Sequence, residues 1–219
     1  MKHLIIVSLV FITSILSCTK VGRNITVKGK VLNPLTGTTY EGIKVQLIRS
    51  KNLQLPGGYT EIKHTHTDAN GEFELNATRL GDVWVQAQSG SDLYVLGWYQ
   101  DGEYISSNFR TTAQKRKTME ADFHLVPYGE VTLDIQNINC ESVEDTMWFR
   151  RKWEFDDDYG NWSPPRVGCF SQSAGSTGSK VPIGNRTYQI RVKRSGVETV
   201  TEETFFIEEN ELTVIQLHY

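Results

Sequence analysis

Aromatic and charged side chains alternate closely between Trp148 and Trp162, and this segment carries the residues best suited to contact a ligand. Aromatic rings offer flat apolar faces, and the neighbouring charged groups supply directional hydrogen bonds, a combination that suits sugar rings or a protein partner. Period-two alternation puts Trp153 on the same strand face as Phe149, which predicts that Trp153 belongs to the core. Trp148 falls on the opposite face, and Trp162 lies in a proline-containing loop.

The predicted ligand-binding set is therefore Trp148, Tyr159 and Trp162. An alternative stays open, in which the same rings serve ordinary sandwich packing and cover the loops. A second group of aromatic residues lies late in the first half of the chain: Tyr94, Trp98, Tyr99 and Tyr104.

Two groups of residues have part of the pattern of a metal site. His64 and His66 project from one strand face, but nothing nearby in the sequence supplies a third ligand. Asp68, Asn70 and Glu72 place oxygens at every second position, as a calcium loop begins, but the later ligands of such a loop are missing. The same test excludes a second acidic pair, Asp156 and Asp158. We predict no metal and no cofactor.

The sequence contains none of the short motifs that mark common catalytic sites. It has no Gly-Xaa-Ser-Xaa-Gly nucleophile turn, no metalloprotease helix motif and no Gly-rich phosphate loop. A formal net charge of −3 and a pI of about 6.0 provide no basic field for nucleic acid. We predict that the protein is not an enzyme and has no nucleic-acid partner.

The first residues have the pattern of an export signal. Lys2 and His3 are followed by the mainly apolar run Leu4–Leu16, which is too short for a standard membrane span. The run ends in Ser14-Ile-Leu-Ser-Cys18, which resembles a bacterial lipoprotein lipobox, although Leu16 replaces the more usual smaller residue. An ordinary secretory signal that happens to end near a cysteine is the alternative.

The lipobox resemblance implies cleavage after residue 17 and acylation of Cys18. Residues 1–17 would then be a lipoprotein signal peptide, and residues 18–24 a tether between lipid and fold. Several acyl chains give lasting anchorage where one chain would be marginal. Thr19, in place of Asp, implies sorting to the outer membrane by analogy with known lipoproteins, and leaves open whether the protein faces the periplasm or the cell surface.

Cys140 and Cys169 are the two cysteines that remain after the lipid-bearing one. An exported protein meets an oxidising compartment, which favours a disulfide between them. Two buried thiols are the alternative, because the sequence does not reveal the distance between the two Cα atoms.

Short runs of alternating apolar and polar residues recur along the chain, separated by Gly, Pro, Asn and Asp. The run 25–31 alternates in this way, as do 43–47 and 119–125, and the same period continues to the C-terminus. Asp68-Ala-Asn-Gly71 favours a tight turn, and we expect it to close a β-hairpin with Phe73 and Leu75 on one face. The fold class predicted is all-β, with two tandem β-sandwiches.

Three segments in order carry a resemblance to a known family: Gly29-Lys-Val-Leu-Asn-Pro-Leu-Thr-Gly37, Gly42-Ile-Lys-Val-Gln-Leu47 and Thr67-Asp-Ala-Asn-Gly-Glu-Phe73. Together they resemble the carboxypeptidase regulatory-like domain, a transthyretin-like β-sandwich. The resemblance implies a first domain at residues 25–127 that folds, spaces or binds and has no catalytic residues. Residues 128–219 are expected to form a second, immunoglobulin-like sandwich.

The lipobox and the first sandwich together also resemble envelope lipoproteins of unknown function from gut-type Gram-negative bacteria. The resemblance implies a non-catalytic, outer-membrane-anchored lipoprotein that acts as a binding or accessory module, with glycan as its ligand class beside a polysaccharide-uptake system. The alternative is a structural or protein-interaction subunit of an envelope complex. The membrane, through Cys18, and a glycan or an envelope protein are thus the expected partners.

Overall fold

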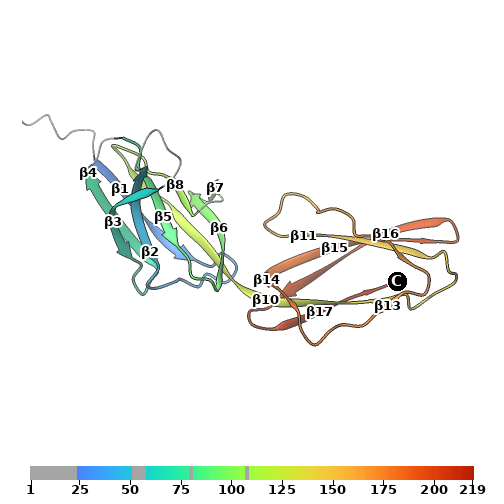
Figure 1. The fold of residues 1–219 in the computed structure, drawn as a ribbon. Coiled ribbons are helices and arrows are strands. Elements are labelled where there is room, and N and C mark those ends of the chain that lie inside the picture. Colours follow the sequence, from blue (N-terminus) through green and yellow to red (C-terminus); the bar gives the residue numbers. More distant parts are fainter. Residues whose placement is uncertain (1–23, 51–57, 79–80, 107–108) are drawn as a thin grey trace, which may run out of the picture. The chain divides into compact units, whose positions relative to one another are not determined.

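The computed structural model describes residues 24–50, 58–78, 81–106 and 109–219, so Cys18 and the expected signal peptide lie outside the described residues. These residues form strands joined by turns, in agreement with the predicted all-β class (Figure 1). They divide into two compact units, of which the first holds the residues up to Gly90 together with Val95–Leu125. The second unit holds Ser91–Tyr94 and Val126–Tyr219. Within the described ranges, no helix is long and apolar enough to cross a membrane.

The first unit is built from two sheets. One sheet has the order β4–β1–β10–β6–β7, with β9 also paired to β1: β4 (Glu72–Thr78), β1 (Asn24–Leu32), β10 (Asp122–Gln136), β6 (Leu93–Gln100), β7 (Glu103–Ser106) and β9 (Thr118–Glu120). The other has the order β3–β2–β5–β8: β3 (Tyr59–His66), β2 (Lys44–Ser50), β5 (Trp84–Gln88) and β8 (Arg110–Thr112). Alternate residues of both sheets are buried, including Val27, Leu75, Val85 and Phe123.

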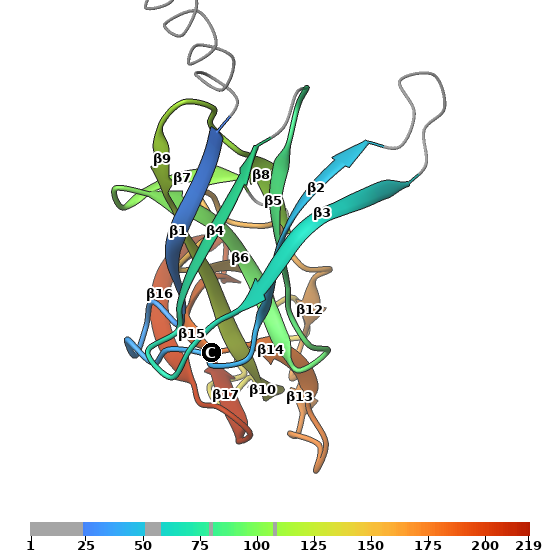
Figure 2. The ribbon, with the colours of Figure 1, turned by 90° about the vertical axis from the view of Figure 1, so that its left-hand side faces the viewer.

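The Asp68–Gly71 segment forms the predicted turn but not the predicted hairpin. Asp68 Oδ1 accepts hydrogen bonds from the amides of Asn70 (2.9 Å) and Glu72 (2.8 Å), and Gly71 has φ of 71°. The strands on either side nevertheless belong to different sheets, since β3 pairs with β2 and β4 pairs with β1 (Figure 2). A strand's partner is set by tertiary contacts as well as by the turn, and here each strand finds its partner elsewhere in the chain.

Phe73 and Leu75 nevertheless lie on one buried face of β4, as predicted, and are 5% and 0% exposed. The turn is also fixed in place by β1, because the amide of Val31 donates to the Gly71 carbonyl at 2.9 Å.

Strand β1 changes partner along its length. Its first part pairs in parallel with β9, through Thr26–Lys28, and its end pairs in parallel with β10, where Val31 is opposite Phe123. At the change, the amide of Lys30 donates to Asp122 Oδ1 (2.8 Å) rather than to a backbone carbonyl. Gly29 lies directly against Ala121, so that an added Cβ would overlap the Ala121 carbonyl.

The second unit also has two sheets. One has the order β12–β11–β15–β16: β12 (Arg166–Val167), β11 (Thr146–Trp153), β15 (Gly184–Arg194) and β16 (Val197–Ile207). The other is formed around β10, which continues from the first unit and pairs with three strands: β13 (Ser171–Gln172), β14 (Ser179–Pro182) and β17 (Leu212–His218). The core between them includes Ile135, Met147, Ile190 and Leu217.

Ser91–Tyr94 belongs to the second unit, although the sequence placed it in the first domain. The reason is the Tyr94 side chain, which packs edge-on against Trp153 (ring centroids 5.4 Å apart) and Tyr128 (6.2 Å). The first unit ends at Leu125, whereas the sequence predicted that the first domain ends at residue 127.

A disulfide joins Cys140 to Cys169, which are 29 positions apart in sequence and have their Cα atoms 5.2 Å apart. It lies beside a buried carboxylate, Asp145, which accepts hydrogen bonds from the amide of Glu141 (2.9 Å) and the side-chain amide of Asn137 (3.2 Å). Arg194 Nε lies 3.6 Å from Asp145 Oδ2. The amide of Glu141 is the largest cause that lowers the pKa of Asp145, so this carboxylate is a satisfied structural group.

Gly29→Ala should destabilise the first unit, because the new methyl group overlaps the Ala121 carbonyl and forces β1 away from the junction between β9 and β10. Overpacking of this kind costs about 1 to 3 kcal/mol. A lower midpoint of urea denaturation would show the effect. Gly90→Ala is the matched control, since its Cβ would meet no atom within 4 Å. Equal midpoints for the two variants would contradict the close approach at Gly29.

Candidate functional site

Strand β11 presents two different sets of side chains on its two faces. Met147 and Trp153 are 0% and 5% exposed and face the core, which confirms the prediction that Trp153 is a core residue. Trp148 and Arg150 alternate with them and therefore project from the other side of the sheet, with Trp148 opposite Arg191 of β15. We call this second side the outer face.

Arginine side chains stack on aromatic rings along the outer face. The Arg150 guanidinium lies over the rings of Tyr159 (4.9 Å to the centroid) and Trp162 (4.6 Å). Arg191 lies over Trp162 and Trp148, at 4.6 Å from each centroid. The result is a continuous arginine–aromatic row in the order Tyr159, Arg150, Trp162, Arg191, Trp148. Each contact of this kind contributes about 0.5 to 1 kcal/mol at an exposed site.

Side-chain hydrogen bonds that run across β11, β15 and β16 hold Arg150 of the arginine–aromatic row in place. Arg150 Nε donates to Gln189 Oε1 at 2.7 Å, and Gln189 Nε2 donates to Glu202 Oε1 of β16 at 2.9 Å. Burial raises the pKa of the Tyr159 hydroxyl, and a hydrogen bond to Glu202 raises it further. The rings are thus fixed to a polar framework whose carboxylate and amide groups lie beside them.

The loop after β11 folds back along that strand and brings two of the rings onto the outer face. The amide of Gly160 donates to the Arg151 carbonyl (3.0 Å), and the amide of Ser163 donates to the Phe149 carbonyl (2.7 Å). Ser163 Oγ accepts from the Phe149 amide in return (3.1 Å). These bonds place Tyr159 and Trp162 next to β11.

The structure brings together all three residues of the predicted ligand-binding set, Trp148, Tyr159 and Trp162. The side chains are half-buried rather than fully exposed, because arginines cover part of the rings. Arg191, Gln189 and Glu202 complete the site and were not identified from the sequence. Their alternation along strands 184–194 and 197–207 was the signal that could have located them.

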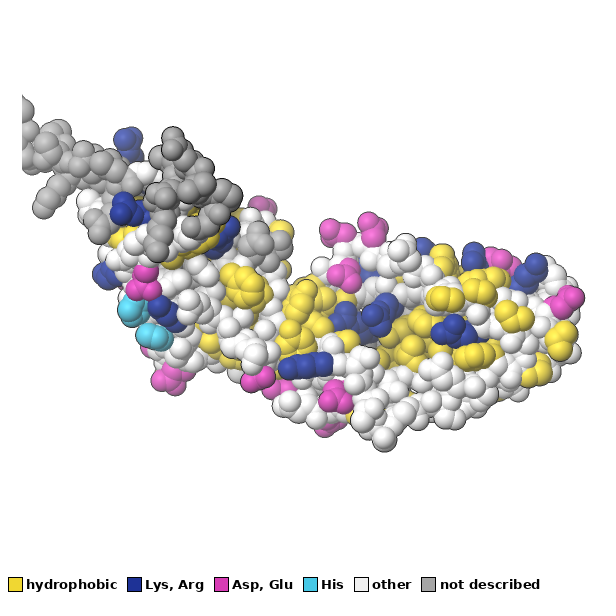
Figure 3. Space-filling model, viewed as in Figure 1, with side chains coloured by type: hydrophobic (Ala, Val, Ile, Leu, Met, Phe, Trp, Pro, Cys, Tyr) yellow, Lys and Arg dark blue, Asp and Glu magenta, His cyan; other side chains and the backbone are white. Residues whose placement is uncertain are grey.

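Figure 3 shows the second unit with basic side chains set among hydrophobic ones on the face turned to the viewer. Such a surface combines apolar contact area with donors for hydrogen bonds.

The residues with part of a metal-site pattern make other contacts. His64 Nδ1 lies 2.6 Å from Glu61 Oε1, and the His64 and His66 rings meet edge to face with centroids 5.7 Å apart. Asp68 is occupied by backbone amides of its own turn. In the part of the chain that the structure describes, no group of three or more His, Cys, Asp or Glu side chains is placed to hold a metal ion.

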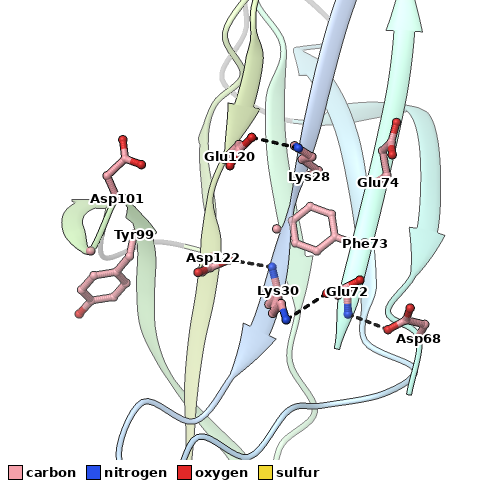
Figure 4. Close-up of a pocket in the computed structure, with 12 residues that line it drawn as sticks. Lys28, Lys30, Asp68, Glu72, Phe73, Glu74, Tyr99, Asp101, Glu120 and Asp122 are labelled. Carbon is pink, nitrogen blue, oxygen red and sulfur yellow. Dashed lines mark hydrogen bonds and ion pairs between the residues drawn. The ribbon is translucent and has the colours of Figure 1, made fainter. Parts of the chain in front are cut away.

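A groove of about 650 Å³ lies on the first unit, over β1, β4 and the β9–β10 junction (Figure 4). Its two lysines are both paired: Lys28 lies 2.9 Å from Glu120, and Lys30 lies 3.0 Å from Glu72. These carboxylates raise the pKa of the two lysines. The groove is lined by cross-strand ion pairs of the kind that stabilise an exposed sheet face.

The second aromatic group, named above from Tyr94 to Tyr104, is dispersed by the fold. Trp98 is fully buried and packs against Phe123 with ring centroids 4.9 Å apart. Tyr99 stacks on His124 at 4.0 Å, whereas Tyr104 is 53% exposed. Tyr94 lies in the second unit, so these four residues do not form one site.

Arg150→Gln should loosen the loop that carries Tyr159 and Trp162, because both rings lose a guanidinium contact. The loss of about 1 to 2 kcal/mol corresponds to roughly tenfold faster amide exchange at Gly160 and Ser163. Hydrogen–deuterium exchange would measure it. Lys193→Gln, on β15 in the same sheet, removes the same charge without touching the rings. If Arg150→Gln exchanged no faster than this control, the row would not hold the loop.

No protein-family model matches the chain, and no curated protein matches it either. Solved structures with some similarity include a streptococcal ancillary pilin, at 17% identity and a TM-score of 0.33, matched over 90% of this chain and 62% of that chain. The minor pilin GBS52 of Streptococcus agalactiae matches at 13% identity and a TM-score of 0.34, over 89% of this chain and 94% of that one. A DUF3823-family protein of Bacteroides uniformis matches at 13% and 0.31, over 85% and 99%. These TM-scores are too low to carry an argument about function.

Proposed function

We propose that this chain is a non-catalytic binding module of the bacterial cell envelope, held at the outer membrane by lipid on Cys18, whose second unit binds a glycan on the outer face. The arginine–aromatic row is the observation that supports the proposal. Flat rings contact the apolar faces of sugar rings, and the adjoining Arg, Gln and Glu groups hydrogen bond to sugar hydroxyls. Such a module would bind the glycan beside a polysaccharide-uptake system and pass it to that system.

The stacking contacts fit this function because they fix the rings before a ligand arrives. A preorganised surface loses less side-chain freedom on binding than a mobile one. Trp148 and Tyr159 stand at the two ends of the row, and each has one guanidinium contact, whereas Trp162 in the middle has two. The two end rings are therefore the principal sugar contacts of the proposal.

Trp148→Ala should weaken retention on a glycan array about tenfold, since one stacking ring is lost. Tyr104→Ala is the matched control, because Tyr104 is an exposed aromatic side chain of the first unit. Equal binding by wild type and Trp148→Ala would remove the outer face from the proposal. Failure of the wild type to bind any glycan would overturn the glycan function itself.

A structural or protein-interaction role is the second candidate, and strand β16 favours it. β16 runs for 11 residues and pairs with β15 on one side, while no described strand pairs with its other side. Its side chains are exposed from Val197 to Thr204. A free edge of this length offers backbone donors and acceptors to a strand of a partner.

A photo-crosslinker at Val200, which is 52% exposed on β16, would test the second candidate in intact envelopes. A discrete adduct with one protein supports strand addition at this edge. The same crosslinker at Val143, 81% exposed and outside every strand, is the control. Equal adducts from both positions, or none from Val200, would count against a partner at β16.

A further inference from the structure

Two arginines occupy positions on the core side of the second unit. Arg151 lies between Phe149 and Trp153 in β11, and Arg186 lies opposite Trp153 on β15. Core-facing positions of a sandwich are ordinarily apolar, as Met147 and Ile190 are on these same strands. Two guanidinium groups at the rim of an apolar core repel each other, so a negatively charged group bound between them would stabilise them.

The two arginines line a small pocket with an aromatic wall. Its volume is about 280 Å³, and Tyr94, Trp153 and Tyr188 line it beside them. The Trp153 ring is held firmly, since its Nε1 donates to the Ile183 carbonyl at 3.0 Å and Arg186 stacks over it at 4.5 Å.

Positive charge in the pocket exceeds the negative charge available to it. Arg186 is half-buried and donates to the Pro182 carbonyl at 3.0 Å. Burial lowers the pKa of its guanidinium, and the charge of Arg151 lowers it further. Asp156 is the carboxylate that lines the pocket, and its Oδ2 already accepts from the Trp153 amide (3.1 Å). Among the described residues, none hydrogen bonds to the Arg151 guanidinium, which is exposed at the rim.

We propose that this pocket binds a carboxylate carried on a single ring, with Arg151 and Arg186 bound to the carboxylate and the ring packed against Trp153 and Tyr94. Guanidinium groups recognise carboxylates through paired, charge-assisted hydrogen bonds. The volume lies just below the range of about 300 to 1,000 Å³ that holds drug-sized ligands, which limits the occupant to about one ring. An acidic sugar and an aromatic acid share this chemistry.

The pocket is distinct from the outer face. Arg150 and Arg151 are neighbours in sequence but project from opposite sides of β11. Acid binding in the pocket therefore does not depend on whether the outer face binds a glycan.

Titration calorimetry of the whole protein with galacturonate, benzoate and the neutral sugar methyl galactoside would test the proposal. We expect binding of at least one acid that Arg151→Gln weakens, whereas any heat from the neutral sugar belongs to the outer face and is unchanged in Arg151→Gln. Saturation by galacturonate alone identifies an acidic sugar as the ligand, and saturation by benzoate alone identifies an aromatic acid. No heat with either acid, or a neutral-sugar signal that Arg151→Gln lowers as much as the acid signal, would overturn the proposal.

Arg151→Gln should weaken acid binding about tenfold or more, because a charge-assisted contact is lost while the exposed side chain leaves the fold intact. Lys193→Gln removes the same charge outside the pocket and should bind as the wild type does. Trp148→Ala should also leave acid binding unchanged, which separates this pocket from the outer face. Unaltered affinity in Arg151→Gln, or equal losses in all three variants, would overturn the assignment.

Discussion

Side chains of a strand alternate between its two sides. In β11 this constraint determines which residues form the core, the outer face and the arginine pocket of the second unit. One register puts Met147 and Trp153 in the core and Trp148 and Arg150 outside it. A shift of one residue would exchange the two sets, so the burial of Met147 and Trp153 fixes the register strongly. The same alternation separates Arg150 from Arg151 and gives two consecutive arginines two different environments.

The arginine side chains make different contacts in those two environments. On the outer face, the guanidinium groups of Arg150 and Arg191 share four aromatic contacts and hold a loop against the sheet. At the rim of the core, Arg186 stacks on Trp153 but remains close to the charge of Arg151. In the first arrangement each guanidinium lies against two rings, and Arg150 also bonds to Gln189, whereas the second retains an excess of positive charge. Lysine would replace arginine poorly in the row, because a planar guanidinium can stack on two rings at once, whereas an ammonium is a compact point charge.

Local patterns in the sequence predicted the strands and the core face well, because both depend on period-two alternation. Trp153 was identified as a core residue in this way, and Phe73 and Leu75 were placed on one face. Pairing between strands was predicted less well: the Asp68–Gly71 turn has the geometry expected of its residues, but its flanking strands pair elsewhere. The contact of Trp162 with Arg191 was also missed, since Arg191 is contributed by a strand that comes after three further short strands. Such contacts depend on the folded arrangement and leave little trace in local sequence.

The change of partner in β1 has a consequence for how the chain folds. The bond between Lys30 and Asp122 joins residues 92 positions apart, and the parallel pairing of β1 with β9 and β10 spans a similar distance. Contacts between residues so distant in sequence form slowly, because a long loop must close before they are gained. While the chain is still emerging, β1 can pair with β4 but its other edge stays open. An open strand edge attracts other chains, so the interval before β9 and β10 appear is the period in which a nascent chain most needs a chaperone.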